Sequence, residues 1–310
     1  MTVDTNYIGK VAYNVANRYF RELVRAISIY GPIIDRNEFD PELDSVNIMI
    51  LLEYIPYDEL IIVSSLEFDY QTILNLRPDV SLTTLDMFEE MYKKGYVDYV
   101  LAVHNSHYAY GGGVFRMYRQ MGYKCTEEAI LFSLERAITS FGTTLNSVLK
   151  GDIQGALSSI YTTIIRASDA ILQKKMGTVP GGWVDAYRSM EREGMNALAH
   201  TLRDVICQVK KYIHDANKLD NLEGKDALEK LTIFMRDTPY RALLIDTYGF
   251  IREAWRIVKN SCMAPLDRLM EIILDAVRDR LPTEIEMRGV DPCPVVRIRK
   301  PGVVMNVELK

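Results

Sequence analysis

Two polar residues, Ser45 and Asn47, stand at the start of an otherwise apolar stretch that ends at Leu52. Residues two apart on a β-strand point to the same face, so a strand here would aim both side chains at one site. Paired carboxylates in this arrangement can share divalent metal ions, whereas a hydroxyl and a carboxamide are oxygen donors without charge. We therefore predict that Ser45 and Asn47 bind a ligand and that the pair holds no metal ion.

Acidic side chains just before this pair offer an alternative. Asp40, Glu42 and Asp44 alternate along the chain, so Glu42 and Asp44 would become metal ligands if the strand began earlier. Pro41 disfavours regular strand pairing there, and an acidic loop is ordinarily just solvated. Asp44 and the more distant Asp79 are the candidate catalytic residues if the site is an enzyme's.

The segment HNSHYAYGGG, residues 104–113, carries two of the four histidines, His104 and His107, followed by aromatic residues and three glycines. Polar groups at a strand end beside a glycine run can form a flexible loop that contacts a small molecule. The alternative, which we favour, is a tight connection between domains in which both histidines are hydrogen-bonded in the interface. Both histidines are candidate ligand-binding residues, and no third metal ligand is near them.

The N-terminal third mixes helical and strand-like patterns. Apolar residues recur at three- and four-residue spacing over 6–24, which predicts a helix, and a second helix over 85–94 is predicted to end at Gly95. Short apolar runs predict strands at 26–30, 46–52, 60–66 and 96–103, with 74–76 as a further piece of the sheet. Because these strands are apolar on both faces, we expect helices on both sides of the sheet.

Past Gly113 the pattern becomes helical. Thr126 and Asp152 are placed to cap two long helices, and GTVPGGW, residues 177–183, predicts a loop after the second. Further helices are predicted at 184–193, 197–217, 225–236, 241–259 and 266–281, with prolines at the start of two of them, Pro239 and Pro265.

The C-terminal tail alternates apolar and basic residues and contains a Pro301-Gly302 turn. This pattern predicts a β-hairpin, which needs another surface to be stable. The predicted fold class is therefore α+β: a mixed-sheet domain over 1–115, a helical bundle over 116–282 and a tail with a hairpin over 283–310.

The composition is that of a soluble globular protein. The 310 residues are 48% hydrophobic and 25% charged, with a mean hydropathy of −0.06, and this length predicts two domains plus a tail. The net charge of −5 and the pI near 5.6 argue against a protein whose main role is to wrap nucleic acid, although a local basic groove stays open. Scarce glutamine with abundant isoleucine, valine and glutamate is a bias seen in thermophiles.

Several other classes of protein are excluded by the sequence. The apolar runs are too short to span a bilayer, and the N-terminus lacks the features of an export signal, so we expect a cytoplasmic protein without a membrane partner. The spacings of the cysteines predict neither a zinc site nor a disulfide framework: Cys125, Cys207, Cys262 and Cys293. No phosphate-binding P-loop or dinucleotide-binding glycine motif occurs.

The order of helix, strand, glycine-containing break, polar loop and strand over residues 6–52 resembles the nucleotidyltransferase fold of the DNA polymerase β superfamily, especially its minimal prokaryotic members. The signature of that family is a strand ending in Gly-Ser, a loop, and Ser-Asp-x-Asp leading an apolar strand. The corresponding residues here are Gly31-Pro32 and Asp44-Ser45-Val46-Asn47. The likeness covers residues 6–115.

This resemblance implies a site that has lost its charge. In the family, the paired aspartates hold metal ions with a nucleoside triphosphate, a third acid activates the attacking hydroxyl, and Gly-Ser contacts phosphate. Ser45 and Asn47 take the places of the aspartates here, and the third acid corresponds to Asp79 or Asp69. Gly31 is kept as a ligand-binding candidate, but the proline after it removes an amide donor.

Residues 158–190 bear a looser resemblance to the HEPN-type and substrate-binding helical domains that accompany such nucleotidyltransferases in prokaryotes. Nuclease-active HEPN domains carry an arginine followed four to six residues later by a histidine. No arginine of this chain has that spacing, since Arg203 precedes His214 by eleven residues. We therefore do not expect an active ribonuclease.

Three functions follow as hypotheses. The leading one is a nucleotidyltransferase-like protein with an inactive metal site, which needs no cofactor, binds a nucleotide or a protein partner, and forms a homo-oligomer. The second is an active enzyme that uses Mg²⁺ to transfer a nucleotidyl group to a hydroxyl, with the acids Asp40, Glu42, Asp44 and Asp79. The third is a structural or interaction protein without nucleotide chemistry.

Overall fold

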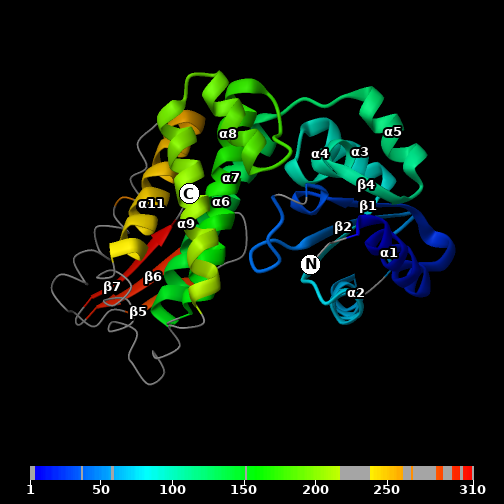
Figure 1. The fold of residues 1–310 in the computed structure, drawn as a ribbon, viewed down its shortest axis with the longest axis horizontal. Coiled ribbons are helices and arrows are strands. Elements are labelled where there is room, and N and C mark those ends of the chain that lie inside the picture. Colours follow the sequence, from blue (N-terminus) through cyan, green and yellow to red (C-terminus); the bar gives the residue numbers. More distant parts are fainter. Residues whose placement is uncertain are drawn as a thin grey trace. The chain divides into compact units, whose positions relative to one another are not determined.

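The protein has an α+β fold, which confirms the predicted class (Figure 1). The computed structural model describes residues 4–35, 38–56, 59–150, 152–216, 238–260 and 267, together with strands at 284–288, 295–300 and 303–308. The chain divides into two compact units. The first contains Met1–Ile130 and Lys175–Ala186, and the second contains Leu131–Lys174 and Tyr187–Lys310.

The first unit is built on a four-stranded mixed sheet. Its strands are β1 (Val24–Tyr30), β2 (Val46–Leu52), β3 (Pro78–Thr84) and β4 (Ser106–Tyr110), in the order β3-β2-β1-β4. The pair β2 and β3 is parallel, and β1 is antiparallel to both β2 and β4. This arrangement confirms the mixed sheet that the sequence predicts.

Helices cover both faces of this sheet, as the apolar strands predict. One face packs on α1 (Thr5–Phe20) and α2 (Glu59–Leu74), and the other on α3 (Leu85–Lys94), α4 (Val97–His104) and α5 (Gly112–Met121). Figure 1 shows α3 and α4 above the strands and α2 below them. Alternate residues of β1 and β2 enter the two cores, so each strand is buried on both sides.

Local sequence signals set several helix ends. Asp4 caps α1 by accepting a hydrogen bond from the Asn6 amide at 2.9 Å. Thr84 caps α3 in the same way, and Gly95 ends that helix with a left-handed φ of 81°, as predicted. The predicted helix over 6–24 is too long, because α1 stops at Phe20 and a 3-10 turn, Arg21–Leu23, leads into β1.

Two predicted strands are helices. Residues 60–66 belong to α2, whose buried side chains Leu66, Tyr70 and Leu74 recur every four residues. Residues 96–103 lie mostly in α4, where apolar residues three apart turn toward the core. The predicted strand piece at 74–76 is also wrong: α2 ends there, and the sheet continues in β3.

The helical region that follows confirms most of its predicted elements. It contains α6 (Glu127–Lys150), α7 (Ile153–Met176), α8 (Trp183–Arg192), α9 (Asn196–Ala216) and α11 (Thr238–Lys259). The hydroxyl of Thr126 accepts from the Ala129 amide and the carboxylate of Asp152 from the Gly155 amide, as both predicted caps require. The predicted helices at 225–236 and 266–281 lie outside the described residues, apart from one helical residue at 267.

A separate antiparallel sheet lies near the C-terminus. It consists of β5 (Glu284–Arg288), β6 (Val295–Lys300) and β7 (Val303–Glu308), in that order. The pair β6 and β7 confirms the predicted hairpin, while β5 adds a strand that the sequence did not predict. Within the part of the chain that the structure describes, no helix is both long and apolar enough to cross a membrane.

Candidate functional site

A row of polar and aromatic residues crosses the first sheet at the end where β2 begins. Asn47 pairs with Asp79 in the parallel neighbour and with Tyr30 in the antiparallel one, and Tyr30 pairs with Ser106 on β4. Registered neighbours in a sheet share a face, so these four side chains belong to the face that α3, α4 and α5 cover. Asp79 is exposed, Asn47 and Ser106 are half-buried, and Tyr30 is buried.

The turn after β1 fits closely against Asn47. Gly31 has φ 83° and ψ −151°, a backbone conformation that favours glycine, and a Cβ there would lie 2.7 Å from Asn47 Nδ2. The hydroxyl of Ser45 donates a long hydrogen bond of 3.4 Å to Asn47 Oδ1. The structure thus brings Gly31, Ser45 and Asn47 together, with the Asn47 amide nitrogen toward the turn and its oxygen toward Ser45.

The turn itself offers few donors to a ligand. The Gly31 amide donates to the carbonyl of Asn105 at 3.2 Å, and Pro32 has no amide hydrogen. The Gly31 carbonyl accepts from the Ile34 amide at 3.1 Å, which closes the turn on itself. The first two residues of the turn therefore leave no amide hydrogen for a phosphate group.

The acidic residues before Ser45 form a local turn. Asp44 Oδ2 accepts from the Asp40 amide at 2.8 Å, and Asp40 Oδ1 accepts from the Glu42 amide at 3.0 Å. Asp40 and Asp44 are buried, with 9% and 6% of their surface exposed. Among the described residues, no group of three histidine, cysteine or acidic side chains is arranged to hold a metal ion. The candidate acids Asp44 and Glu42 therefore lie in this turn. Among the candidate acids, Asp79 is the one that pairs with Asn47.

The two histidines lie on opposite faces of the sheet. His107 is on β4, beside Ile29, and its ring lies against α1, where a Cβ on Gly9 would come within 3.2 Å of His107 Nε2. His104 ends α4 and shares a 3.0 Å hydrogen bond with the hydroxyl of Tyr92. Burial, followed by the charge of Arg119, lowers the pKa of His104 below its usual value. The two side chains do not form one site.

The glycines after His107 start a helix instead of a flexible loop. Gly111 takes a left-handed conformation with φ 61° and precedes α5, which begins at Gly112. A side chain at Gly111 would collide with the carbonyl of Arg25 on β1. The glycine is therefore needed for close packing against the first strand.

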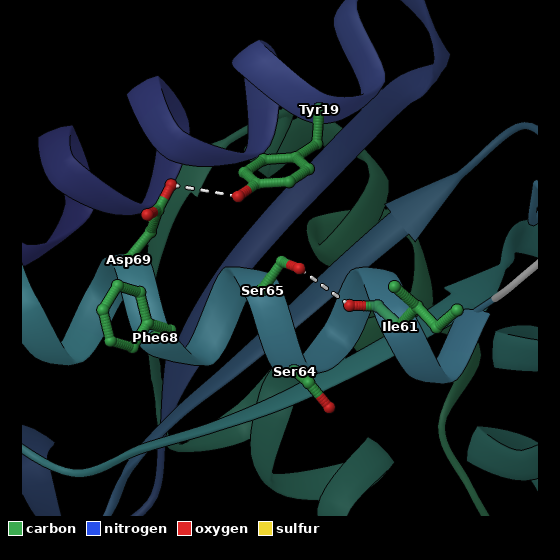
Figure 2. Close-up of a pocket in the computed structure, with 6 residues that line it drawn as sticks. All are labelled: Tyr19, Ile61, Ser64, Ser65, Phe68 and Asp69. Carbon is green, nitrogen blue, oxygen red and sulfur yellow. Dashed lines mark hydrogen bonds between the residues drawn. The ribbon is translucent and has the colours of Figure 1, made fainter.

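Asp69, the other candidate for the third acid, lies on α2, which packs on the opposite face of the sheet from the Asn47 row. Its carboxylate accepts from the Tyr19 hydroxyl at 3.1 Å and lies 3.4 Å from the Arg18 guanidinium. Asp69 lines an open groove of about 620 Å³ between α1 and α2. Figure 2 shows Asp69 beside Tyr19 of α1, and Ser65 donating to the Ile61 carbonyl on α2. Ile61 and Phe68 are 68% and 69% exposed there.

A distant segment of the first unit reaches the Gly31 turn. The side chain of Asn105, whose carbonyl accepts from Gly31, donates a short hydrogen bond to the Gly181 carbonyl. The carboxylate of Glu38 fills the space that a side chain on Gly182 would need. The sequence predicted the loop at 177–183 but not its contacts with Asn105 and Glu38. Asn105, Tyr30 and Ser106 were also missed, although Tyr30 directly precedes the glycine that marked the site.

Comparison with solved structures finds likeness at low sequence identity. The chain is similar to a nucleotidyltransferase-like protein from Exiguobacterium sibiricum 255-15, whose crystal structure shares 12% sequence identity over 96% of this chain and 99% of that chain, with a TM-score of 0.30. No family model matches the chain. No curated protein matches it either.

Proposed function

We propose that the first unit is a nucleotidyltransferase-like domain with an inactive metal site, and that it binds a nucleotide or a protein partner without transferring a nucleotidyl group. The observation that carries this proposal is the pairing of Asn47 with Asp79, with Ser45 hydrogen-bonded to Asn47. These are the three positions at which the family resembled by residues 6–115 has carboxylates. Only one of them is charged in this chain.

The charge of this site is too small for metal-dependent transfer. Mg²⁺ requires a tight octahedral shell and is usually held by carboxylates together with substrate phosphates. Asp79 supplies one carboxylate, while Ser45 and Asn47 supply neutral oxygens that are already oriented toward each other. A neutral pair can instead hydrogen-bond the hydroxyl, amide or ring nitrogen groups of a ligand.

The Gly31 turn supports the same proposal. Its amide is used by Asn105, and the proline that follows has none, so the turn lacks the donors that would orient a phosphate for in-line attack. The rival acidic set is disfavoured because Asp40 and Asp44 accept hydrogen bonds within their own turn. A ligand of this site would therefore be held by Asp79, Asn47 and Ser45, because Tyr30 in the same row is buried.

A thermal-shift series with ATP, CTP, GTP and UTP, each with and without Mn²⁺, tests this proposal. A ligand that binds only the native state raises the melting temperature, so a nucleotide shift without metal would identify a binding protein. If no nucleotide changes the melting temperature, the ligand of the proposed binding protein is a protein partner. A shift that appears only with Mn²⁺, and is lost on Asp79→Asn, would contradict the proposal and favour the active enzyme.

A further inference from the structure

A second pocket lies at the opposite end of β1 from Gly31. It has a volume of about 480 Å³ and is formed where the C-terminus of α1 meets the start of β1 and the end of β4. We call it the α1 pocket, and its lining residues are Tyr13, Asn17, Arg21, Glu22, Val24, Arg25 and Tyr110. Since β1 has seven residues, the two sites are separated by roughly 20 Å of strand.

Arg21 is held in a backbone conformation that disfavours a side chain. Its φ of 47° and ψ of −120° match the first central position of a type II′ turn, which is normally glycine. The side chain is exposed, and its guanidinium makes no ion pair or hydrogen bond with the residues that the structure describes. Strained residues of this kind concentrate at functional sites, so the strain makes Arg21 a candidate functional residue.

Arg25 reaches the same pocket through a second irregularity. The pairing of β1 with β2 shifts register between Val24 and Ala26, and Arg25 is the one exposed residue of the strand. Register shifts of this type redirect a side chain out of the regular alternation. The guanidinium pairs closely with Glu53, and both side chains are about half exposed, so the pair is open to competition by another anion.

Two tyrosines complete the pocket. The rings of Tyr13 and Tyr110 have centroids 4.9 Å apart and are tilted by 36°, and Tyr110 is 42% exposed. An exposed ring fixed by a neighbouring ring is a suitable surface for stacking a planar base. The exposed carboxamide of Asn17 adds a donor and an acceptor at the same place.

We propose that the α1 pocket binds the phosphate ester of a nucleotide, either free or within a single strand of nucleic acid. Guanidinium groups match the geometry of phosphate oxygens, so Arg21 and Arg25 bind the phosphate while Tyr110 stacks on the base. Glu22 also lines the pocket and Glu53 pairs with Arg25, so the local charge favours one phosphate over a triphosphate. This site is independent of the proposed function at Asn47.

The test measures binding to the full chain at low ionic strength with three probes: inorganic phosphate, adenosine monophosphate and a short labelled single-stranded RNA. The decisive variant is Arg21→Gly, because glycine relieves the backbone strain while it removes the cation. We expect this variant to bind adenosine monophosphate or RNA about tenfold more weakly or worse, with an unchanged or higher melting temperature. Tyr110→Leu should weaken base-containing probes more than inorganic phosphate.

Matched controls make the outcomes decisive. Arg18→Gln removes an exposed arginine of α1 that faces Asp69 outside the pocket, and it should leave binding unchanged. Tighter binding of RNA than of the mononucleotide would identify a strand, and binding of the mononucleotide alone would identify a free nucleotide. The inference is overturned if no probe binds, or if binding survives both Arg21→Gly and Arg25→Gln. Binding that is lost only on Asn47→Ala would belong to the other site.

Discussion

Asn47 on β2 is the registered partner of Asp79 on β3, in a parallel pair of strands. Adjacent strands are about 5 Å apart, so the carboxamide and the carboxylate lie on one face within reach of a shared ligand. Two carboxylates in these positions would repel each other unless a cation lay between them. The neutral asparagine carboxamide avoids that repulsion.

Carboxylates at positions 45 and 47 should create a metal site beside Asp79. We expect the Ser45→Asp/Asn47→Asp variant to melt at a lower temperature than the parent protein without metal, because three close carboxylates repel one another. Mn²⁺ should reverse this loss, since saturation at 100 times the dissociation constant stabilises a protein by about 2.7 kcal/mol.

The control for this experiment is Asp79→Asn in the same background, which should abolish the Mn²⁺ response, while the parent protein should show none. If Mn²⁺ does not raise the melting temperature of the double variant, the three positions do not converge as the strand register indicates.

The turn after β1 should tolerate no side chain. Gly31→Ala forces a Cβ into a left-handed backbone region and toward Asn47 Nδ2, so we expect a loss of about 1–3 kcal/mol in the free energy of unfolding. Gly113→Ala is the matched control, because it lies in α5 with open space around its Cβ position. That change should stabilise the protein by about 0.5–1 kcal/mol. Equal effects of the two substitutions, measured by urea unfolding, would refute this account.

His104 should make stability depend on pH. Its pKa in the folded protein is lowered by burial and by Arg119, so the unfolded chain binds the proton more tightly. Stability should therefore be full above the ordinary histidine pKa of about 6.5 and decrease as the pH falls through the lower pKa of the folded state. His104→Gln should make the melting temperature less dependent on pH between pH 7 and the lower pKa of the folded state. A steeper pH dependence in the variant would contradict the prediction.

The cap of α6 should contribute measurably to stability. The Thr126 hydroxyl accepts from the Ala129 amide at 3.3 Å and donates to the Lys94 carbonyl at 3.1 Å, so it joins the start of α6 to the end of α3. Thr126→Ala should cost about 1–2 kcal/mol. Thr143→Ala removes an exposed threonine within the same helix and should be neutral or slightly stabilising, because alanine is the better helix former. Denaturant unfolding of both variants checks the difference.

Periodicity predicted the long helices and the two central strands but failed at α2 and α4. Residues 60–66 and 96–103 are apolar runs of strand length, and a run of that kind does not distinguish a buried strand from a buried helix. In α2 the deciding signal lay beyond the run, where Tyr70 and Leu74 continue the spacing from Leu66. In α4 the β-branched valines favoured the strand, and tertiary packing overrode that preference.

The candidate site was predictable only in part. Spacing identified Ser45 and Asn47, and the family resemblance included Asp79 among the acids to consider. The hydrogen bond from the Gly31 amide to the Asn105 carbonyl was not predictable. Every residue type has a backbone carbonyl, and this partner is distant in the chain. Gly181 and Gly182 were visible as loop residues, but only the fold shows that Asn105 and Glu38 occupy the space beside them.

Because the first unit includes Lys175–Ala186, its last segment is synthesised after the first part of the second unit. On the ribosome, the sheet and its helices emerge long before Gly181 and Gly182, so Asn105 and Glu38 have no partner in that loop while α6 and α7 are still being made. The nascent unit completes its contacts around the Gly31 turn only after α6 and α7 have been translated. The packing around that turn is therefore completed late, when the next unit has already begun to emerge.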